Sequence, residues 1–268
     1  MQMNLSSSFE LIPATDVVVE RCVNGVIEKL QDYVAEETPV ALEYNGVASA
    51  VMMATPTNLR DFAFGYSLTE GVVDSIADIF DCEIYSGVKG VRIGLTISSR
   101  CFSRLKRHRR SMAGRTGCGI CGVESLNHVY RDLPPVEERE EFDLELMDKV
   151  LAGLKKNQAL FNQTGATHAA FWVQPEGAVS CVREDVGRHN AVDKLLGALS
   201  LSGADFSEGL MLTTSRASFE IVQKAAAVGV GHIVAISAPT AMAIRLANEL
   251  NVSLTGFMRQ GGYVLYAR

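Results

Sequence analysis

Apolar and polar positions along the chain change their period several times, and each period predicts a different element. Residues 38–44 and 47–53 alternate on either side of Asn45-Gly46, which is typical of a β-hairpin. Apolar positions at helical spacing over residues 56–69 predict a helix. A further alternation over residues 91–97 predicts a half-buried strand. The first half is therefore expected to be short strands around one helix.

The second half alternates between strands and helices after a polar linker that contains Pro134-Pro135. Such alternation predicts a sheet with helices on both faces. The predicted helices cover about 143–157, 188–199, 217–228 and 240–250, and the predicted strands about 169–174, 178–184, 210–214, 232–237, 253–258 and 262–266.

The order of these elements is also that of the cytidine-deaminase-like fold, which is an analogy of topology and not of function. The expected class is therefore α/β, with a small α+β domain over residues 1–135 and a cytidine-deaminase-like three-layer α/β/α domain over residues 136–268. A zinc deaminase needs His-x-Glu and Pro-Cys-x-x-Cys at two helix starts. The corresponding starts read Arg188-His189-Asn190 and Ser215-Arg216-Ala217, so deamination is not expected.

Composition and charge exclude several classes of function. The net charge of −6 argues against a general nucleic-acid binder. No run of about 18 apolar residues appears, so no membrane span is predicted. The first residues lack a basic start and an apolar stretch, so no secretory signal is predicted. Six cysteines without such a signal indicate a reducing compartment, and we expect a cytoplasmic protein.

A local concentration of positive charge runs from Arg100 to Arg115, with seven Lys or Arg residues, His108 and no acid. Acidic residues dominate from Glu137 to Glu145. The basic run could meet an anionic ligand or partner. It could equally be a solvated, partly disordered loop, and the sequence leaves both interpretations open.

Two cysteines, Cys118 and Cys121, follow the basic run in the stretch Thr116-Gly117-Cys118-Gly119-Ile120-Cys121-Gly122. The neighbouring glycines leave the sulfur atoms little side-chain cover, and Arg115 would favour the thiolate. Three functions fit this pair. They are a zinc site, for which no second cysteine pair exists; dithiol–disulfide exchange; and sulfur carriage, in which one thiolate takes a sulfur atom as a persulfide and the other assists.

Polar turns at three strand-to-helix transitions predict an anion site. Arg188 and His189 lie at the first turn, and Ser215 and Arg216 lie at the second. The third is Ser237-Ala238-Pro239-Thr240. Free amide groups at helix starts receive anions, and in parallel sheets such turns share one edge. A solvated helix start capped by Asp185 explains the first turn equally well. His168 could be a ligand or a packed core histidine.

The last two strands are joined by the segment Phe257-Met258-Arg259-Gln260-Gly261-Gly262. An aromatic ring, an arginine and two glycines could stack on and clamp a purine base. An ordinary glycine hairpin has the same composition, so the residues alone do not decide.

Several of these segments together resemble the formate dehydrogenase accessory sulfurtransferase family (FdhD). The resemblance rests on the Cys118 to Cys121 stretch, on Thr164-Gly165-Ala166-Thr167-His168, and above all on Glu184-Asp185-Val186-Gly187-Arg188-His189-Asn190-Ala191-Val192-Asp193-Lys194. Arg216-Ala217-Ser218-Phe219-Glu220 and Thr55-Pro56 fit as well. The chain departs from the pattern at Thr214-Ser215-Arg216, where the family usually has Ser-Gly-Arg.

The resemblance implies a cytoplasmic homodimer that accepts sulfur from a cysteine desulfurase. The sulfur would be held as a persulfide on Cys118, with Cys121 as the second catalytic residue. It would pass to the bis-molybdopterin-guanine-dinucleotide cofactor that formate dehydrogenase requires. The resemblance places cofactor binding on Phe257 to Gly262, and a guanine nucleotide would mimic the cofactor. Two alternatives remain at this point, a non-catalytic cofactor-binding chaperone and a zinc-stabilised structural module.

Overall fold

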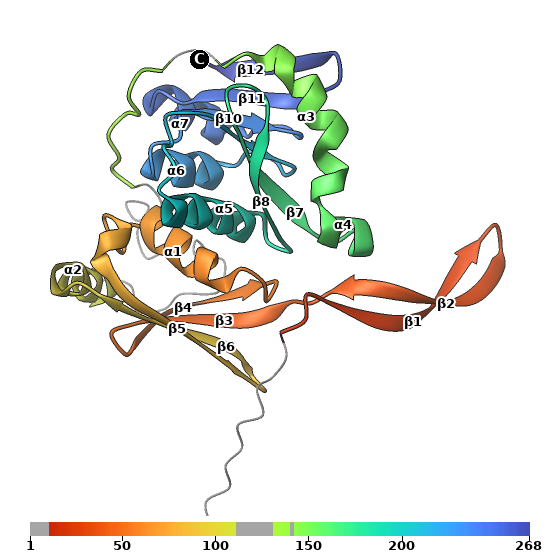
Figure 1. Cartoon of the computed structure of the whole chain (residues 1–268), viewed down its shortest axis with the longest axis horizontal. Coiled ribbons are helices and arrows are strands. Elements are labelled where there is room, and N and C mark those ends of the chain that lie inside the picture. The colour runs from red at the N-terminus through yellow and green to blue at the C-terminus, as the bar shows by residue number, and fades with distance from the viewer. Residues whose placement is uncertain (1–10, 111–130, 140–141) are drawn as a thin grey trace, which may run out of the picture.

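A computed structural model describes residues 11–110, 131–139 and 142–268. For residues 108–110 it describes the backbone but not the side chains. The chain is a mixed α/β protein with three sheets (Figure 1). None of the helices in these ranges is long and apolar enough to cross a membrane.

The first half of the described chain contains six strands and two α-helices. In chain order its elements are β1 (Ala14–Val23), β2 (Val26–Ala35), β3 (Thr38–Tyr44), β4 (Val47–Ala54), α1 (Leu59–Thr69), the short 3-10 helix η1 (Ile76–Asp78), β5 (Ile79–Gly87), β6 (Gly90–Ile97) and α2 (Ser99–Arg110).

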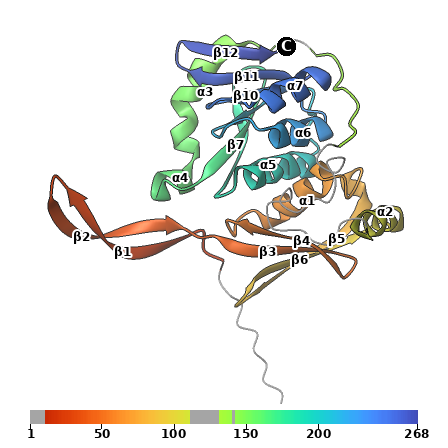
Figure 2. The same cartoon turned by 180° about the vertical axis from the view of Figure 1, so that it is seen from behind.

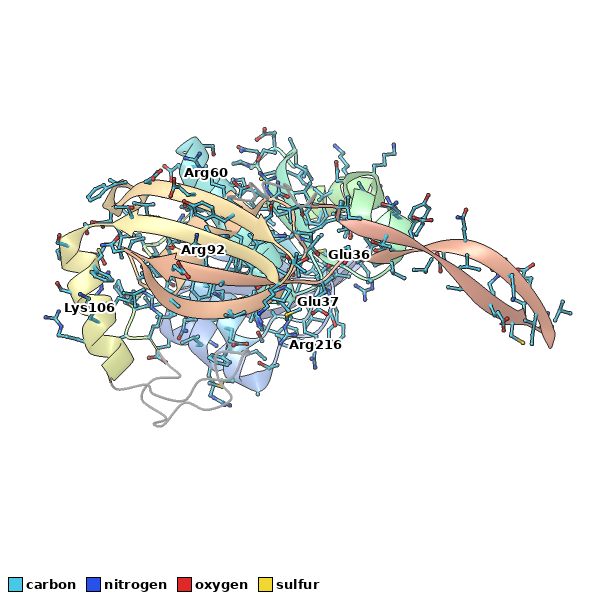
Figure 3. All side chains as sticks on the ribbon, turned by 90° about the horizontal axis from the view of Figure 1, so that it is seen from below. Glu36, Glu37, Arg60, Arg92, Lys106 and Arg216 are labelled. Carbon is cyan, nitrogen blue, oxygen red and sulfur yellow. The ribbon has the colours of Figure 1, made fainter. Side chains whose placement is uncertain are left out.

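Four of these strands form a sheet in the order β4-β3-β6-β5, with β3 and β6 parallel and the other neighbours antiparallel. Val40, Leu42, Ile93 and Leu95 point to one face and are buried with residues of α1, because alternate strand residues share a face. Arg92 lies on the opposite, outer face of this sheet, which Figure 3 shows from below.

Strands β1 and β2 form a separate two-stranded sheet that extends from the body as an arm (Figures 1 and 3). Its turn is Asn24-Gly25, where both residues have positive φ, as a two-residue hairpin turn requires. Glu36 and Glu37 lie at its base, where the chain passes into β3. The arm was not predicted from the sequence.

The second half contains a six-stranded sheet and its helices. In chain order its elements are η3 (Leu144–Leu146), α3 (Met147–Gly153), η4 (Leu154–Asn157), α4 (Ala159–Thr164), β7 (His168–Val173), β8 (Val179–Asp185), α5 (Arg188–Ser202), β9 (Leu210–Thr213), α6 (Phe219–Ala227), β10 (His232–Ala235), α7 (Ala241–Glu249), β11 (Ser253–Arg259) and β12 (Gly262–Ala267).

The strands of this sheet follow the order β12-β11-β10-β9-β7-β8, and β9, β10 and β11 are parallel. Helices α5, α6 and α7 pack on one face, around Trp172 and Met211. Helix α3 packs on the other face, over Phe171 and Val234 (Figures 1 and 2). The predicted order of elements is therefore confirmed, with helices on both faces of the sheet. The assignment to the cytidine-deaminase-like fold and the division at residue 135 stay predictions.

Helices α1 and α5 lie between the two larger sheets and pack directly on each other (Figure 1). Two glycines make this possible. A Cβ atom on Gly65 would lie 1.7 Å from the carbonyl oxygen of Asp193, and one on Gly197 would lie 1.9 Å from that of Asp61. Backbone therefore meets backbone at this crossing, which joins the first half to the second.

The structure differs from the prediction for the basic run. Residues 99–110 form α2, so this part is not a disordered loop. Cys101 and Leu105 are buried in the core of the first half, and Phe102 is partly buried against it. Arg100 and Arg104 bind the Asp74 carboxylate. Arg100, Lys106 and Arg107 are exposed, whereas the apolar face of the helix is buried.

Candidate functional site

One edge of the six-stranded sheet gathers the polar turns that the sequence singled out. The carboxyl ends of β8, β9, β10 and β11 meet there, and His168 at the start of antiparallel β7 is paired with Asp185 at the end of β8. Backbone bonds link neighbouring turns, from Ile236 N to Thr213 O (2.9 Å) and from Phe257 N to Ser237 O (3.1 Å). The prediction that these turns share an edge is confirmed.

His189 and Glu220 connect the starts of α5 and α6 at this edge. The His189 Nε2 atom lies 2.7 Å from Glu220 Oε2 and 3.5 Å from Ser218 Oγ. Both side chains are about one-quarter exposed, so solvent or a ligand can reach the pair. Glu220 was not predicted as a site residue, although an acid in the first turn of a helix is an identifiable signal.

Positive charge accumulates beside this pair. Burial lowers the pKa of His168, and the neighbouring Arg188 guanidinium and His189 ring lower it further. His168 is therefore neutral near pH 7. The Nε atom of Arg188 is buried and has no hydrogen-bond partner within the described part of the chain. Arg188, at the first position of α5, can thus favour an anion that approaches this edge.

At the second predicted turn, one residue, Ser215, is internal and the other, Arg216, is exposed. Ser215 is buried, and its hydroxyl bonds with Thr213 Oγ1 (2.9 Å) and the Arg216 carbonyl (3.0 Å). These bonds stabilise the turn, so the Ser215 hydroxyl is occupied. Arg216 is exposed, and no hydrogen bond or ion pair to its guanidinium occurs among the described residues. The guanidinium of Arg216 can therefore contact a ligand.

The segment from Phe257 to Gly262 also lies at this edge, and its residues face different surroundings. Phe257 is 45% exposed and has a positive φ of 51°. Met258 is buried under α3, so its side chain belongs to the core. Arg259 donates to the carbonyls of Ile236 and Met258. The Phe257 ring is therefore the side chain best placed to stack on a planar group.

Gln260 and Gly261 form the turn between β11 and β12, and Gly262 is the first residue of β12. Gln260 is exposed, and Gly261 takes a positive φ of 75°. The Gly261 amide donates to Asp148 Oδ1 of α3 at 3.1 Å. Of these three predicted ligand residues, the two glycines would offer backbone only.

Asp185 and Lys194 of the longest motif have an internal function. Lys194 Nζ lies 2.6 Å from Asp185 Oδ2, both side chains are fully buried, and burial lowers the pKa of Lys194. The two side chains bind the backbone of Thr55, with Lys194 donating to its carbonyl (2.9 Å) and Asp185 accepting from its amide (3.0 Å). Asn190 donates to the Met53 carbonyl (2.7 Å). The motif thus joins the two halves.

This finding corrects the interpretation of the first turn as a solvated helix start capped by Asp185, whereas the anion site at this turn stays a prediction. Asp185 is not a solvent-exposed cap of α5, whose N-cap is Gly187 without a side-chain bond. Asp185 and Lys194 also cannot reach an anion, because each is fully buried among internal partners. Arg188 and His189 of this motif are partly exposed and lie at the sheet edge.

A second buried network joins α1, α5 and α6. Lys224 Nζ lies 2.9 Å from Asp193 Oδ2, 2.7 Å from Glu70 Oε1 and 3.1 Å from Thr69 Oγ1. Burial opposes the charged form of Lys224, but the two carboxylates outweigh it and raise its pKa. Sequence reasoning missed this network. Its signal is an Asp-Lys pair, Asp193 and Lys194, inside an otherwise apolar helix.

The two predicted catalytic cysteines, Cys118 and Cys121, lie outside the described residues. The chain re-enters the described part at Arg131, which is partly buried against the carboxyl end of α1. Its guanidinium donates to the carbonyls of Leu68 and Thr69, and its amide donates to Gln223 Oε1 (2.8 Å). The chain that follows the cysteines is therefore fixed at the junction of α1 and α6.

One group of potential metal ligands occurs within the described ranges, namely Asp74, Asp78 and Cys101. Arg100 pairs with both carboxylates, at 2.8 Å from Asp74 and 3.2 Å from Asp78. Arg104 adds a third contact at 2.7 Å from Asp74. The positive charge next to these carboxylates is arginine, so the group is an ion-pair cluster that holds α2.

A cavity of about 620 Å³ lies at the opposite edge of the six-stranded sheet, at the amino ends of β10 and β11. His232 and Ser253 line it, and Glu137, Glu138 and Glu145 lie around it. The four carboxylates of Glu137, Glu138, Asp143 and Glu145 outnumber the guanidinium groups of Arg139 and Arg268 in its lining, which disfavours an anionic ligand there. The anion-favouring groups are therefore on the edge described above.

These features define a class: a mixed α/β protein whose two halves are joined by a glycine helix crossing and buried ion pairs, with polar turns converging on one edge of the larger sheet. The sequence model of the FdhD/NarQ family matches residues 35–268. The chain belongs to this family.

Two relatives show how close the similarity is. The chain is 52% identical over 249 residues to "Sulfur carrier protein FdhD" of Cupriavidus necator, covering 93% of this chain and 86% of the relative. It is 50% identical over 254 residues to the protein of the same name from Bordetella petrii, covering 94% and 91%. The crystal structure of a formate dehydrogenase accessory protein from Desulfotalea psychrophila shares the fold, with a TM-score of 0.73, 21% identity, and coverage of 96% and 98%.

Proposed function

We propose that this protein is a cytoplasmic sulfur carrier that acts as a homodimer in the maturation of formate dehydrogenase. It takes a sulfur atom from a cysteine desulfurase as a persulfide on Cys118 and delivers it to the bis-molybdopterin-guanine-dinucleotide cofactor. The observation that carries the proposal is the 52% identity over 93% of the chain to a protein named as a sulfur carrier. The glycine-flanked cysteine pair supplies the chemistry that this name requires.

The loading step is an exchange between sulfur atoms. The Cys118 thiolate attacks the outer sulfur of the donor's cysteine persulfide, a new S–S bond forms, and the donor cysteine leaves as a thiolate. Cys121 serves the release. Its thiolate attacks the inner sulfur of the Cys118 persulfide, which forms a disulfide and sets hydrosulfide free for the acceptor. A dithiol reductant then reopens the disulfide, which restores both thiols.

The acceptor is proposed to bind at the edge of the six-stranded sheet. Arg188 and Arg216 would neutralise phosphate oxygens, and the start of α5 adds backbone amides. His189 would contribute a further polar contact beside Glu220. The exposed ring of Phe257 would stack on guanine. This arrangement explains why an acidic protein has cationic groups converging on one sheet edge.

The thiol chemistry is tested with three variants, Cys118→Ala, Cys121→Ala and the double variant. Each purified protein is incubated with a cysteine desulfurase and cysteine, and the peptides are analysed by mass spectrometry. We expect the parent to gain the mass of one sulfur atom on Cys118 and the Cys118→Ala variant to lose most of this gain. Cys22→Ala is the matched control, because Cys22 is an exposed cysteine on the arm.

The same variants are then expressed in cells that lack the native factor, and formate dehydrogenase activity is measured. The proposal predicts that the double alanine variant fails to restore activity. Full restoration would instead favour the alternative of a cofactor-binding chaperone without catalytic thiols. Guanosine diphosphate titration tests the acceptor site independently. Arg216→Ala should weaken nucleotide binding, whereas Arg92→Ala on the outer face of the other sheet should not.

A further inference from the structure

The arm formed by β1 and β2 has a concentration of exposed apolar side chains. Six large apolar side chains on its twenty strand residues are exposed, namely Val18, Val23, Val26, Ile27, Tyr33 and Val34. Val18 reaches 72% exposure and Val26 reaches 68%. Such a concentration marks an interaction surface, because monomeric proteins rarely leave contiguous apolar patches in water.

Both faces of the arm carry exposed apolar side chains, and each face also holds one exposed ion pair. Residues that pair across the two strands share a face, and the register pairs Val23 with Val26 on one face and Cys22 with Ile27 on the other. Val18 belongs to the second face, together with the pair of Glu20 and Lys29. A flat partner would cover only one face, so the pattern requires an occupant that reaches both.

The arm also cannot be stable by itself. An isolated two-stranded hairpin is marginal in water, and the outer edges of β1 and β2 leave rows of backbone groups unpaired. Helix α4 contacts β2 near the base, but the tip extends beyond the body (Figures 1 and 3). Because no described residue outside the arm covers the tip, we look for the occupant in another molecule.

We propose that this occupant is a second copy of the chain, and that the arms are exchanged reciprocally in the dimer. Each arm would place one face on the partner's body and the other against the partner's arm, as two-fold symmetry allows. At concentrations above the dimer dissociation constant, a second copy covers the arm continuously. A desulfurase or a dehydrogenase would cover it only during an encounter.

The area is sufficient for this role. Ten residues per strand make an arm about 33 Å long, and two strands make it about 10 Å wide. Two arms buried on both faces therefore remove about 1,300 Å² of surface, which lies within the usual range for a stable interface. The inference rests on the proposed homodimer and is independent of sulfur transfer.

Sedimentation equilibrium of the full chain, from about 0.1 to 100 µM, tests the proposal. The variant Val18→Lys/Val26→Lys places one charge on each face of the arm, at positions that water already reaches in the monomer. We expect the dimer dissociation constant to rise at least about tenfold. Val51→Lys is the matched control, because Val51 is a valine that is 55% exposed on β4, and it should leave the constant unchanged.

Hydrogen exchange of the arm amides identifies the occupant. We expect amides in residues 14–35 of the parent to be protected at dimer concentrations, and the double lysine variant to lose this protection while its circular dichroism stays unchanged. Protection that arises only when desulfurase or dehydrogenase is added would overturn the proposal. A parent that is monomeric at every concentration refutes the dimer itself. If the double lysine variant dimerises as tightly as the parent, the arm is not the dimer interface, although the dimer itself stands.

Discussion

The crossing of α1 and α5 allows a sharp test of what holds the two halves together. In Gly65→Ala the new Cβ atom would lie 1.7 Å from the carbonyl oxygen of Asp193, whereas an ordinary contact begins at 3.4 Å. Because the obstacle is backbone on a neighbouring helix, no side-chain rotation relieves it, and the helices must separate by more than about 1.5 Å. Separation would also stretch the Thr69 to Asp193 bond of 2.6 Å.

The expected cost follows from these contacts. Overpacking of a well-filled interior costs about 1 to 3 kcal/mol and sometimes more, while Ala gains about 1 kcal/mol over Gly in a helix. The contact at Gly65 is backbone against backbone and adjoins a buried ion network, so we expect a net loss of about 3 kcal/mol. Gly153→Ala is the control. Its Cβ meets nothing within 4 Å, and its φ of −93° suits alanine.

Urea unfolding of both variants measures the difference. Far-UV circular dichroism follows both halves, whereas the fluorescence of Trp172, the chain's one tryptophan, follows the core of the second half. In Gly65→Ala we expect the dichroism to change at lower urea concentration than the fluorescence, because the first half loses its packing against α5. The double variant Gly65→Ala/Gly197→Ala should cost less than the two single losses together, since one separation of the helices relieves both clashes. Equal stability of Gly65→Ala and Gly153→Ala within about 0.5 kcal/mol would refute this reasoning.

Three further outcomes are expected. Lys194→Met leaves Asp185 buried without its cation and should cost about 3 kcal/mol in urea unfolding, whereas Arg92→Met at an exposed pair should cost about 1 kcal/mol or less. The pKa of His168 is lowered in the folded state, so the stability it contributes is complete above its unfolded pKa of about 6.5 and is lost as the pH falls below that value. His168→Gln should therefore reduce the change in the urea midpoint between pH 7 and pH 5. A pH dependence equal to that of the parent would contradict the lowered pKa of His168. Phe257→Gly should raise stability by about 1 kcal/mol and weaken guanosine diphosphate binding, and tighter binding would contradict the stacking role.

The sequence patterns predicted the elements whose apolar period is uninterrupted. The hairpin around Asn45-Gly46 and the strands and helices from β7 onward were located to within a few residues. Before β7, the single helix predicted over 143–157 is divided into η3, α3 and η4, and α4 was missed. The arm was missed although Asn24-Gly25 is the same turn signal. Its strands have apolar residues on both faces, so the alternation that identifies a half-buried strand is absent. Helix α2 was missed because arginines mask its three apolar positions.

The candidate site shows a different limit of sequence reasoning. Composition identified the turn at Asp185 to Lys194, but it could not say which polar side chains point inward. Thr55 decides this, because its amide, carbonyl and hydroxyl all bind residues of that motif. Thr55 is 130 positions or more away in sequence from these partners, and no local pattern reports such a contact. Only the structure therefore shows which side chains of this motif are buried.

Backbone strain gives an independent reason to place ligand binding at Phe257. Five non-glycine residues of the described chain have positive φ, and the other four, at positions 24, 45, 58 and 251, are asparagines. Asparagine tolerates this region because its short polar side chain can bond locally, whereas an aromatic residue has no such compensation. The strand register is irregular between Gly256 and Arg259, so the chain departs from regular pairing here as well. Because a strained and exposed aromatic persists only when the surrounding structure holds it, and strain of this kind concentrates at binding sites, Phe257 is singled out without reference to any relative.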